Sequence, residues 1–311
     1  MNAAQPRVTI VTPSYNQAAF LEETILSVLE QDYPNLEYFV VDDGSTDGSD
    51  EIIRRYEDRL DWWTVQENAG QVAALNHGFG RATGAYLGWL NSDDVLLPGA
   101  IGAVVAVLES DPELLLAYGD NVFIDEGGRE LSAAPAQEFD LARMIRECQN
   151  GVPQPGSLFR RRALEIAPLN ERGYYFFDYE FAIRLGAAGR VRHLARNLAG
   201  YRLHSESKTV ASPLRKAGDY VRLAEEFFGA ADFPTALRSH TRAGRAAAYL
   251  AAGEYAYAGL DLPRARRYLL HGVALSRGRV PARLLGIALR SLLPRRLVER
   301  GRARRTTQGT A

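Results

Sequence analysis

Acidic residues follow two short apolar segments in the first hundred positions of the sequence. Asp42 and Asp43 end the segment 36–41, and Asn-Ser-Asp-Asp at 91–94 follows the segment 87–90. An ionised carboxylate can accept hydrogen bonds from a nucleotide base or a ribose hydroxyl. Two adjacent carboxylates repel each other, so ionisation of both favours a bound cation, and oxygen ligands suit Mg²⁺ or Mn²⁺ that bridges to phosphates. The pattern therefore predicts a nucleotide site with a divalent cation.

Each acidic pair also has a purely structural interpretation. Asp42, Asp43 and Asp47 can build a turn and cap the helix that follows, because Asp and Ser are common in such turns. The second pair can cap the helix expected near Pro98, although Asp94 lies too far upstream to be its immediate cap.

Two further candidates lie in the second half of the chain. Asp178 and Glu180 follow the aromatic run 174–177 at the start of a predicted helix, and residues two apart point to different sides, so only one of them can face a crevice. Aromatic surroundings raise the pKa of a carboxylate and suit it to accept a proton near neutral pH. The alternative is pairing with the helix N-terminus. His204 can donate to a phosphate, ligate a metal, or be an ordinary surface residue.

Alternating strands and helices are expected to position these residues. Apolar segments typical of strands occur at 8–12, 36–41, 62–65 and 86–90, with helical spacing between them, for example over 71–81. Such alternation predicts an α/β fold with a mixed, mostly parallel sheet covered by helices on both faces. Ligands of such sheets bind beyond the carboxyl ends of the strands, where the polar segments would converge.

The pattern changes along the rest of the chain. Residues 117–205 are less regular, and after a boundary at 205–213 the sequence is rich in Ala, Leu and Arg with helical periodicity. We expect a first domain at 1–212 and an α-helical extension at 213–311. The helical pattern of the extension is interrupted near Pro213, Pro234, Pro263, Pro281 and Pro294.

Composition limits the class of protein. The chain has 311 residues, of which 46% are hydrophobic and 24% charged, and its one cysteine, Cys148, excludes an internal disulfide. No secretory signal and no apolar stretch of bilayer length are visible, so we expect a cytoplasmic protein. The sequence from residue 277 onward contains ten arginines and one glutamate, so this part of the chain is strongly basic. The basic, leucine-containing stretch 283–305 can lie on an anionic membrane or pack on the body of the protein.

Seven short motifs occur in an order that resembles the family 2 nucleotide-sugar glycosyltransferases of the GT-A fold. They cover about residues 7–208: VTIVTPSYN at 8–16, VDDGSTDGS at 41–49, ENAG at 67–70, NSDD at 91–94, QPGS with FRR at 154–161, FDYE at 177–180 and YRLH at 201–204.

The resemblance implies a metal-dependent, inverting sugar transfer and a role for each matching residue. The nucleoside would be held by Pro13, Tyr15, Asp42 and Asp43, and the base or phosphates would lie near Asn68 and Gly70. The DxD motif would correspond to Asp93 and Asp94, with Asp94 as the direct metal ligand. Asp178 would be the general base, with Glu180 as a competing candidate, and His204 would contact the diphosphate or metal.

The partners implied are a nucleotide diphosphate sugar, Mg²⁺ or Mn²⁺, and a hydroxyl of a glycan or lipid-linked acceptor, as in polysaccharide biosynthesis; nucleic acid is not among them. Residues 7–116 would bind the donor and 117–205 would shape the acceptor side. A nucleotidyltransferase is an alternative, but no early Gly-rich loop with a Lys is present. A non-catalytic binding module that uses the helical extension is the other alternative.

Overall fold

A computed structural model describes residues 5–171, 175–204, 213–277, 280–293 and 296. The chain forms two compact units: residues 1–140 together with 150–205, and residues 141–149 together with 206–311. Most of the predicted boundary at 205–213 lies outside the described residues.

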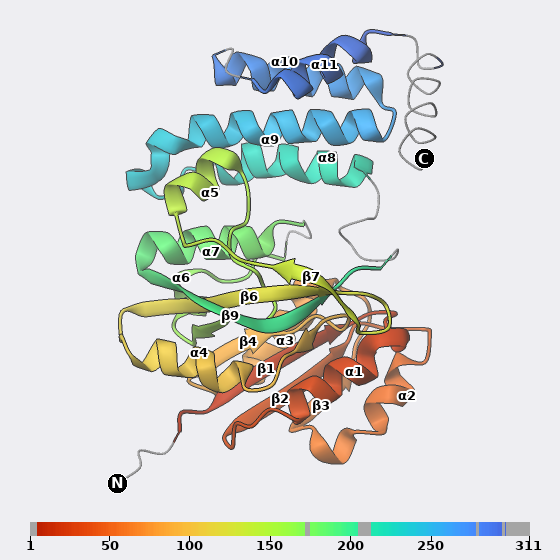
Figure 1. The fold of residues 1–311 in the computed structure, drawn as a ribbon, viewed down its shortest axis with the longest axis vertical. Helices are drawn as coiled ribbons and strands as arrows, with labels where there is room; N and C mark the ends of the chain where they lie inside the picture. The colour runs from red at the N-terminus through yellow and green to blue at the C-terminus, as the bar shows by residue number, and fades with distance from the viewer. Residues whose placement is uncertain (1–4, 172–174, 205–212, 278–279, 294–295, 297–311) are drawn as a thin grey trace. The chain divides into compact units, whose positions relative to one another are not determined.

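The first unit alternates strands and helices from its beginning (Figure 1). Its strands are β1 (Val8–Ser14), β2 (Leu36–Asp42), β3 (Trp62–Val65), β4 (Tyr86–Trp89), β5 (Val95–Leu96), β6 (Leu114–Ile124), β7 (Glu130–Ala134), β8 (Leu158–Arg160) and β9 (Arg190–Arg202). Its helices are α1 (Ala18–Leu29), α2 (Ser49–Arg54), α3 (Gln71–Arg81), α4 (Ala100–Glu109), α6 (Ala163–Ile166) and α7 (Phe177–Ala188).

The strands form one mixed sheet in the order β3-β2-β1-β4-β8-β6-β9-β5, and β7 pairs with β6. Strands β1 to β4 pair in parallel, β8 runs antiparallel to β4 and β6, and β9 runs parallel to β6 and antiparallel to β5. The predicted fold class, a mixed and mostly parallel sheet with helices and a C-terminal helical part, is therefore confirmed. The parallel run places the carboxyl ends of β1 to β4 at one edge.

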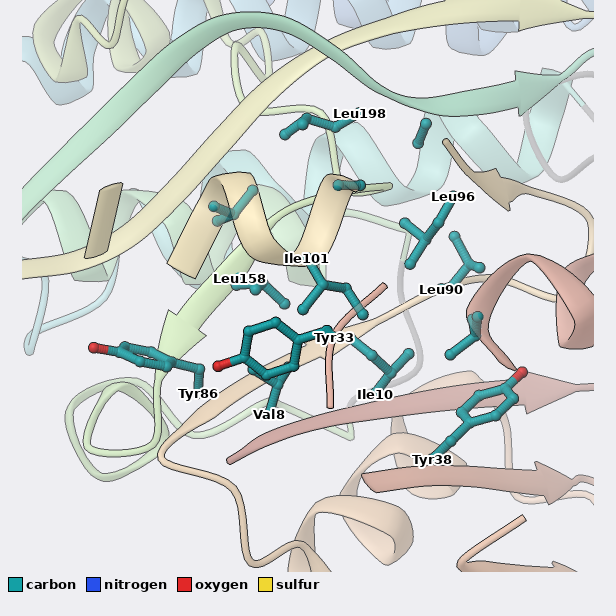
Figure 2. Close-up of a cluster of buried hydrophobic side chains, with 14 of the residues drawn as sticks. Val8, Ile10, Tyr33, Tyr38, Tyr86, Leu90, Leu96, Ile101, Leu158 and Leu198 are labelled. Carbon is teal, nitrogen blue, oxygen red and sulfur yellow. The ribbon is translucent and has the colours of Figure 1, made fainter. Parts of the chain in front are cut away.

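Alternate residues of the strands bury against helices on opposite faces of the sheet. On one face, Val8 and Ile10 of β1 join a core cluster with α1 and α4, and Figure 2 shows them beside Ile101 and Leu158. On the other face, aromatic rings from α3, β4, β8 and α7 pack together; Trp89 lies 5.9 to 6.4 Å, centroid to centroid, from several of them. The apolar residues of each strand thus fix the sheet between two helical layers.

The second unit is helical. It contains α5 (Leu141–Glu147), α8 (Pro213–Arg222), α9 (Arg238–Ala258), α10 (Leu262–Ser276) and α11 (Ala282–Ser291). Helices α9 and α10 lie side by side (Figure 1), and at Gly253 an added Cβ would come within 2.5 Å of Leu269, so only glycine permits this close packing. No described helix is both long and apolar enough to cross a bilayer. Of the predicted basic stretch 283–305, the structure describes mainly the part in α11.

Candidate active site

Side-chain hydrogen bonds join the loops that follow β1 and β2. The backbone N–H of Thr46 donates to Asn16 Oδ1 at 2.8 Å, and the N–H of Asn16 donates to Ser45 Oγ at 2.9 Å. Asp47 accepts from the N–H of Ala18 at 2.8 Å. Asn16 has φ of 51°, which asparagine tolerates better than most residues. The two strand ends therefore form a single rim.

Asp42 has the structural role that the sequence left open as an alternative. Its side chain is fully buried and accepts hydrogen bonds from the N–H of Gly44 (3.1 Å) and from the N–H and hydroxyl of Ser45 (2.8 and 2.6 Å). Gly44 has φ of +80°, and a Cβ there would lie 3.1 Å from the carbonyl oxygen of Gln66. Asp42 is thus enclosed by its own turn, and its predicted contact with the nucleoside stays a prediction.

Asp43 holds the loop that follows β3. Its carboxylate accepts from Gln66 Nε2 (2.8 Å), from the N–H of Ala69 (3.0 Å) and from the N–H of Gly70 (2.8 Å), and it is almost fully buried. Asn68, within the same loop, is exposed. The structure thus makes Asp43 the residue that positions Asn68 and Gly70 at the crevice.

The loop after β4 is connected to this arrangement. Gln71, which follows Gly70 at the start of α3, donates from Nε2 to Asn91 Oδ1 at 2.7 Å, and Asn91 donates to Asp94 Oδ2 at 3.4 Å. Asp43 and Asp94 are therefore linked through one short chain of contacts at the carboxyl edge of the sheet. The four strand-end segments converge as the sequence predicts.

Pro13 and Tyr15 differ in exposure. Pro13 is buried within β1 opposite Val41 of β2, whereas Tyr15 lies just beyond the strand with 48% of its surface exposed. Tyr15 is thus the more accessible of the two to a ligand. The nucleoside-binding roles of both residues stay predictions.

The two carboxylates of the second acidic pair lie in different environments. Asp94 is 1% exposed, and its Oδ1 accepts from the backbone N–H of Arg202 at 3.0 Å. Burial, and then the charge of the neighbouring Asp93, raise the pKa of Asp94 well above its ordinary value. The direct metal contact that the sequence assigns to Asp94 stays a prediction.

Asp93 is the more exposed member of the acidic pair, and it contacts the buried side chain of His204. Asp93 retains 22% exposure of its side chain, and its Oδ2 lies 3.1 Å from His204 Nε2. The His204 ring packs on Phe20, with the ring centroids 4.7 Å apart. Within the described residues, no group of three or more His, Cys, Asp or Glu side chains is arranged to hold a metal ion. Two converging donors still suit Mg²⁺ or Mn²⁺, which commonly complete their coordination with water and substrate phosphates.

Arg202 brings the end of β9 to the acidic pair, a role that the sequence does not reveal. The guanidinium is buried and donates to the carbonyl oxygens of Asp93 (2.8 Å), Asp125 (2.9 Å) and Glu126 (3.1 Å) and to Glu23 Oε2 (2.6 Å). Arg202 lies within the YRLH motif, but its bonding partners come from three distant segments. Its position fixes His204 two residues further on.

Asp178 lies in the first turn of α7, half-buried beside the end of β4. The ring of the preceding residue, Phe177, lies 5.9 Å from that of Trp89, and Asn150 Nδ2 donates to Asp178 Oδ2 at 2.9 Å. Burial raises the pKa of the Asp178 carboxyl, while the hydrogen bond from Asn150 opposes that rise. Asn150 is the second functional candidate that the sequence did not indicate.

Glu180, the competing candidate, is placed differently. It is buried, and its Oε1 lies 3.2 Å from Arg184 Nη2 one turn further along α7. This ion pair gives Glu180 a structural task. The geometry therefore favours Asp178 of the two carboxylates as a group that can reach a substrate.

A mixed sheet whose strand-end loops close around an acidic pair, followed by C-terminal helices, defines the GT-A class of glycosyltransferase folds. The profile described as "Glycosyl transferase family 2" matches residues 9–166. The chain belongs to glycosyl transferase family 2, and it is an enzyme of the glycosyltransferase type.

Relatives support this assignment. An uncharacterized glycosyltransferase of Rickettsia prowazekii is 36% identical over 239 residues, which are 73% of each chain. The putative teichuronic acid biosynthesis glycosyltransferase TuaG of Bacillus subtilis is 42% identical over 93 residues, 29% of this chain and 37% of that protein. The latter match thus spans well under half of the relative.

Solved structures share the fold. The Staphylococcus aureus TarS structure in complex with UDP-GlcNAc has a TM-score of 0.64 at 18% identity, covering 96% of this chain and 87% of that one. The mannosyltransferase PcManGT of Pyrobaculum calidifontis, in complex with GDP-Man and Mn²⁺, has a TM-score of 0.57 at 21% identity, covering 93% and 88%. At these identities the likeness concerns the fold.

Proposed function

We propose that the protein transfers a sugar, with inversion at the anomeric carbon, from a nucleotide diphosphate sugar to a hydroxyl of a glycan or lipid-linked acceptor. The observation that carries this proposal is the set of hydrogen bonds that joins the loops after β1, β2, β3 and β4 at one edge of the sheet, where Asp93 contacts His204. Family membership supports sugar transfer over nucleotidyl transfer and over non-catalytic binding. The UDP-GlcNAc and GDP-Man bound by the structural neighbours support a nucleotide-sugar donor.

The donor side is built on residues 7–116. Tyr15, exposed at the end of β1, and Asn68, exposed in the loop held by Asp43, can contact the nucleoside from two sides of the rim. Gly70 immediately precedes α3, and the N-terminus of a helix of this length favours a phosphate group. Asp42 and Asp43 serve this side by fixing the loops.

Asp93 and His204 are the residues that would hold a divalent cation. The approach of Asp93 Oδ2 to His204 Nε2 (3.1 Å) puts an oxygen and a nitrogen donor at one point of the crevice. A bound Mg²⁺ or Mn²⁺ would supply electrostatic stabilisation of a diphosphate. Arg202 maintains the pair because it holds the backbone of Asp93 through its Nε.

Asp178 is the proposed general base on the acceptor side, within residues 117–205. The acceptor oxygen forms a bond to the anomeric carbon while the bond to the diphosphate breaks and its electron pair leaves with the nucleotide. Asp178 takes the proton of the acceptor hydroxyl. Asn150 orients the carboxylate through Oδ2, and burial brings its pKa closer to neutral pH, where base strength and ionisation are better balanced.

Donor binding tests the proposal directly. We would measure the melting temperature with UDP-, GDP- and dTDP-sugars, with and without Mg²⁺ or Mn²⁺, and follow labelled sugar and labelled NTP as competing substrates. We expect one class of nucleotide sugar to raise the melting temperature, and to do so only with metal. Asp93→Asn should abolish this increase, and Asp32→Asn, at an exposed site before β2, should preserve it.

Two results would contradict the proposal. Equal stabilisation of the wild-type protein with and without metal would contradict the proposed role of a divalent cation in donor binding. Turnover of labelled NTP without sugar transfer would show that the protein is a nucleotidyltransferase instead.

A further inference from the structure

Helix α11 has apolar residues on two sides. Leu284 and Ile287 are buried within the helical unit, so one side of the helix already has its packing partners. Four leucines are turned to solvent, with exposures of 44 to 68%; these outer leucines are Leu285, Leu289, Leu292 and Leu293. Their spacing of four, three and one residues keeps them on one side of the helix and its C-terminal turn. Exposed apolar groups at this density mark an interaction surface.

A groove continues this surface. A cavity of about 650 Å³ lies within the helical unit, and Leu292 and Leu293 line it together with Leu214, Leu260 and Leu262. Its polar lining includes Asp261 and Arg266. Because two of the outer leucines also line the groove, the helix face adjoins a groove whose lining combines leucines with Asp261 and Arg266.

The sequence around these leucines is rich in arginine. The segment 262–291, which contains α10 and α11, has seven arginines and no acidic residue, and residues 292–311 add six arginines and one glutamate. Within the described residues, Arg264 pairs with Asp261 (3.2 Å) and Arg283 with Glu254 (2.6 Å), so acids outside the segment neutralise only part of the charge. The surface therefore combines leucines with a large positive charge.

We propose that the outer leucines and the adjoining groove dock on an anionic lipid bilayer. The leucines would enter the boundary between headgroups and acyl chains, and the arginines would lie among the lipid phosphates. A second copy of this chain fits less well, because its segment 262–311 would bring the same positive charge to the interface. The proposal concerns α10 and α11 and does not require sugar transfer, although it would suit an acceptor carried on a lipid.

Vesicle sedimentation tests the proposal on the full chain. We would compare vesicles of phosphatidylcholine alone with vesicles that also contain phosphatidylglycerol. We expect binding to the anionic vesicles only, decreasing as salt is added. Leu289→Glu with Leu292→Glu should weaken binding by at least about tenfold, because two apolar contacts are lost and two negative charges are added. Leu131→Glu, an equivalent change on exposed β7, should have no effect.

The controls separate this proposal from its alternatives. The melting temperature and the increase caused by donor and metal should be the same in the double variant and in the wild-type protein, which shows that fold and donor site are intact. Unchanged vesicle binding by the double variant would overturn the proposal, as would equal binding to neutral vesicles. A dimer in solution that the double variant dissociates, without vesicle binding by the wild type, would assign the surface to a second copy instead.

Discussion

Replacement of Asn150 should change the pH at which the enzyme becomes active. Asp178 can act as a base only when ionised, so kcat/KM should rise with pH through the pKa of its carboxyl. Burial raises this pKa, and the hydrogen bond from Asn150 Nδ2 at 2.9 Å favours the ionised form and lowers it. Asn150→Ala removes this bond and should therefore move the rising limb to higher pH.

The size of the change follows from the energy of the bond. A hydrogen bond to a charged group contributes about 1.5 to 3 kcal/mol, and about 1.4 kcal/mol corresponds to one pH unit. The limb should therefore move up by about one to two pH units. Well below the limb, kcat/KM should fall by about 10- to 100-fold, and at high pH most of the loss should be recovered.

The assay is the pH profile of kcat/KM for labelled sugar transfer. Asn35→Ala is a matched control, since Asn35 bonds to Gln5 on an exposed loop before β2 and should leave the profile unchanged. A uniform loss at every pH would refute the reasoning, because it would show that Asn150 supports the fold or substrate binding. An unchanged limb would likewise mean that Asp178 is not the titrating base.

Two further substitutions, each compared with a second variant, test the proposed base and Arg202, which supports the proposed metal site. Asp178→Asn should lower kcat by at least about 100-fold, while the donor should still raise the melting temperature of the variant. Glu180→Gln should mainly lower stability. A large loss of kcat in Glu180→Gln but not in Asp178→Asn would reassign the base to Glu180. Arg202→Ala should lower the free energy of unfolding by about 3 kcal/mol, since it removes a buried guanidinium that donates to three partly buried carbonyl groups and pairs with Glu23. Arg55→Ala, which breaks an exposed pair with Glu22, should cost less than about 1 kcal/mol, and equal midpoints in urea for the two variants would contradict this difference.

The sequence predicts the parallel part of the sheet well because its evidence is local. The strand at 62–65 and the helix at 71–81 occur with the bounds expected from apolar spacing. Polar segments after each strand converge because parallel strands end at one edge. Local patterns thus identified the edge of the sheet at which these segments meet. They did not distinguish Asp93 from Asp94, which differ in exposure.

The difference between Asp93 and Asp94 depends on a contact across more than a hundred residues. Strand β5 pairs with β9 through Val95 and Gly200, and this pairing brings the N–H of Arg202 to Asp94 Oδ1. The pairing encloses Asp94 and leaves Asp93 beside His204. No spacing within residues 91–94 records this arrangement, so the sequence could not predict that β9 encloses Asp94 more than Asp93.

The position of Asn150 shows a second limit of local patterns. The chain leaves the first unit after Asp140, forms α5 within the helical unit, and returns to the first unit at Asn150. The segment that leads back to the first unit is fixed at the end of α5. There the N–H of Gln149 donates to the carbonyl oxygen of Met144 at 3.2 Å, and Cys148 is buried with φ of 54°. The residue that orients Asp178 is therefore anchored covalently to the helical unit. A division of the chain at residue 212 assigns only the C-terminal residues to the helical unit. The chain itself also runs from α5 of that unit to Asn150, which donates a hydrogen bond to Asp178, the proposed base.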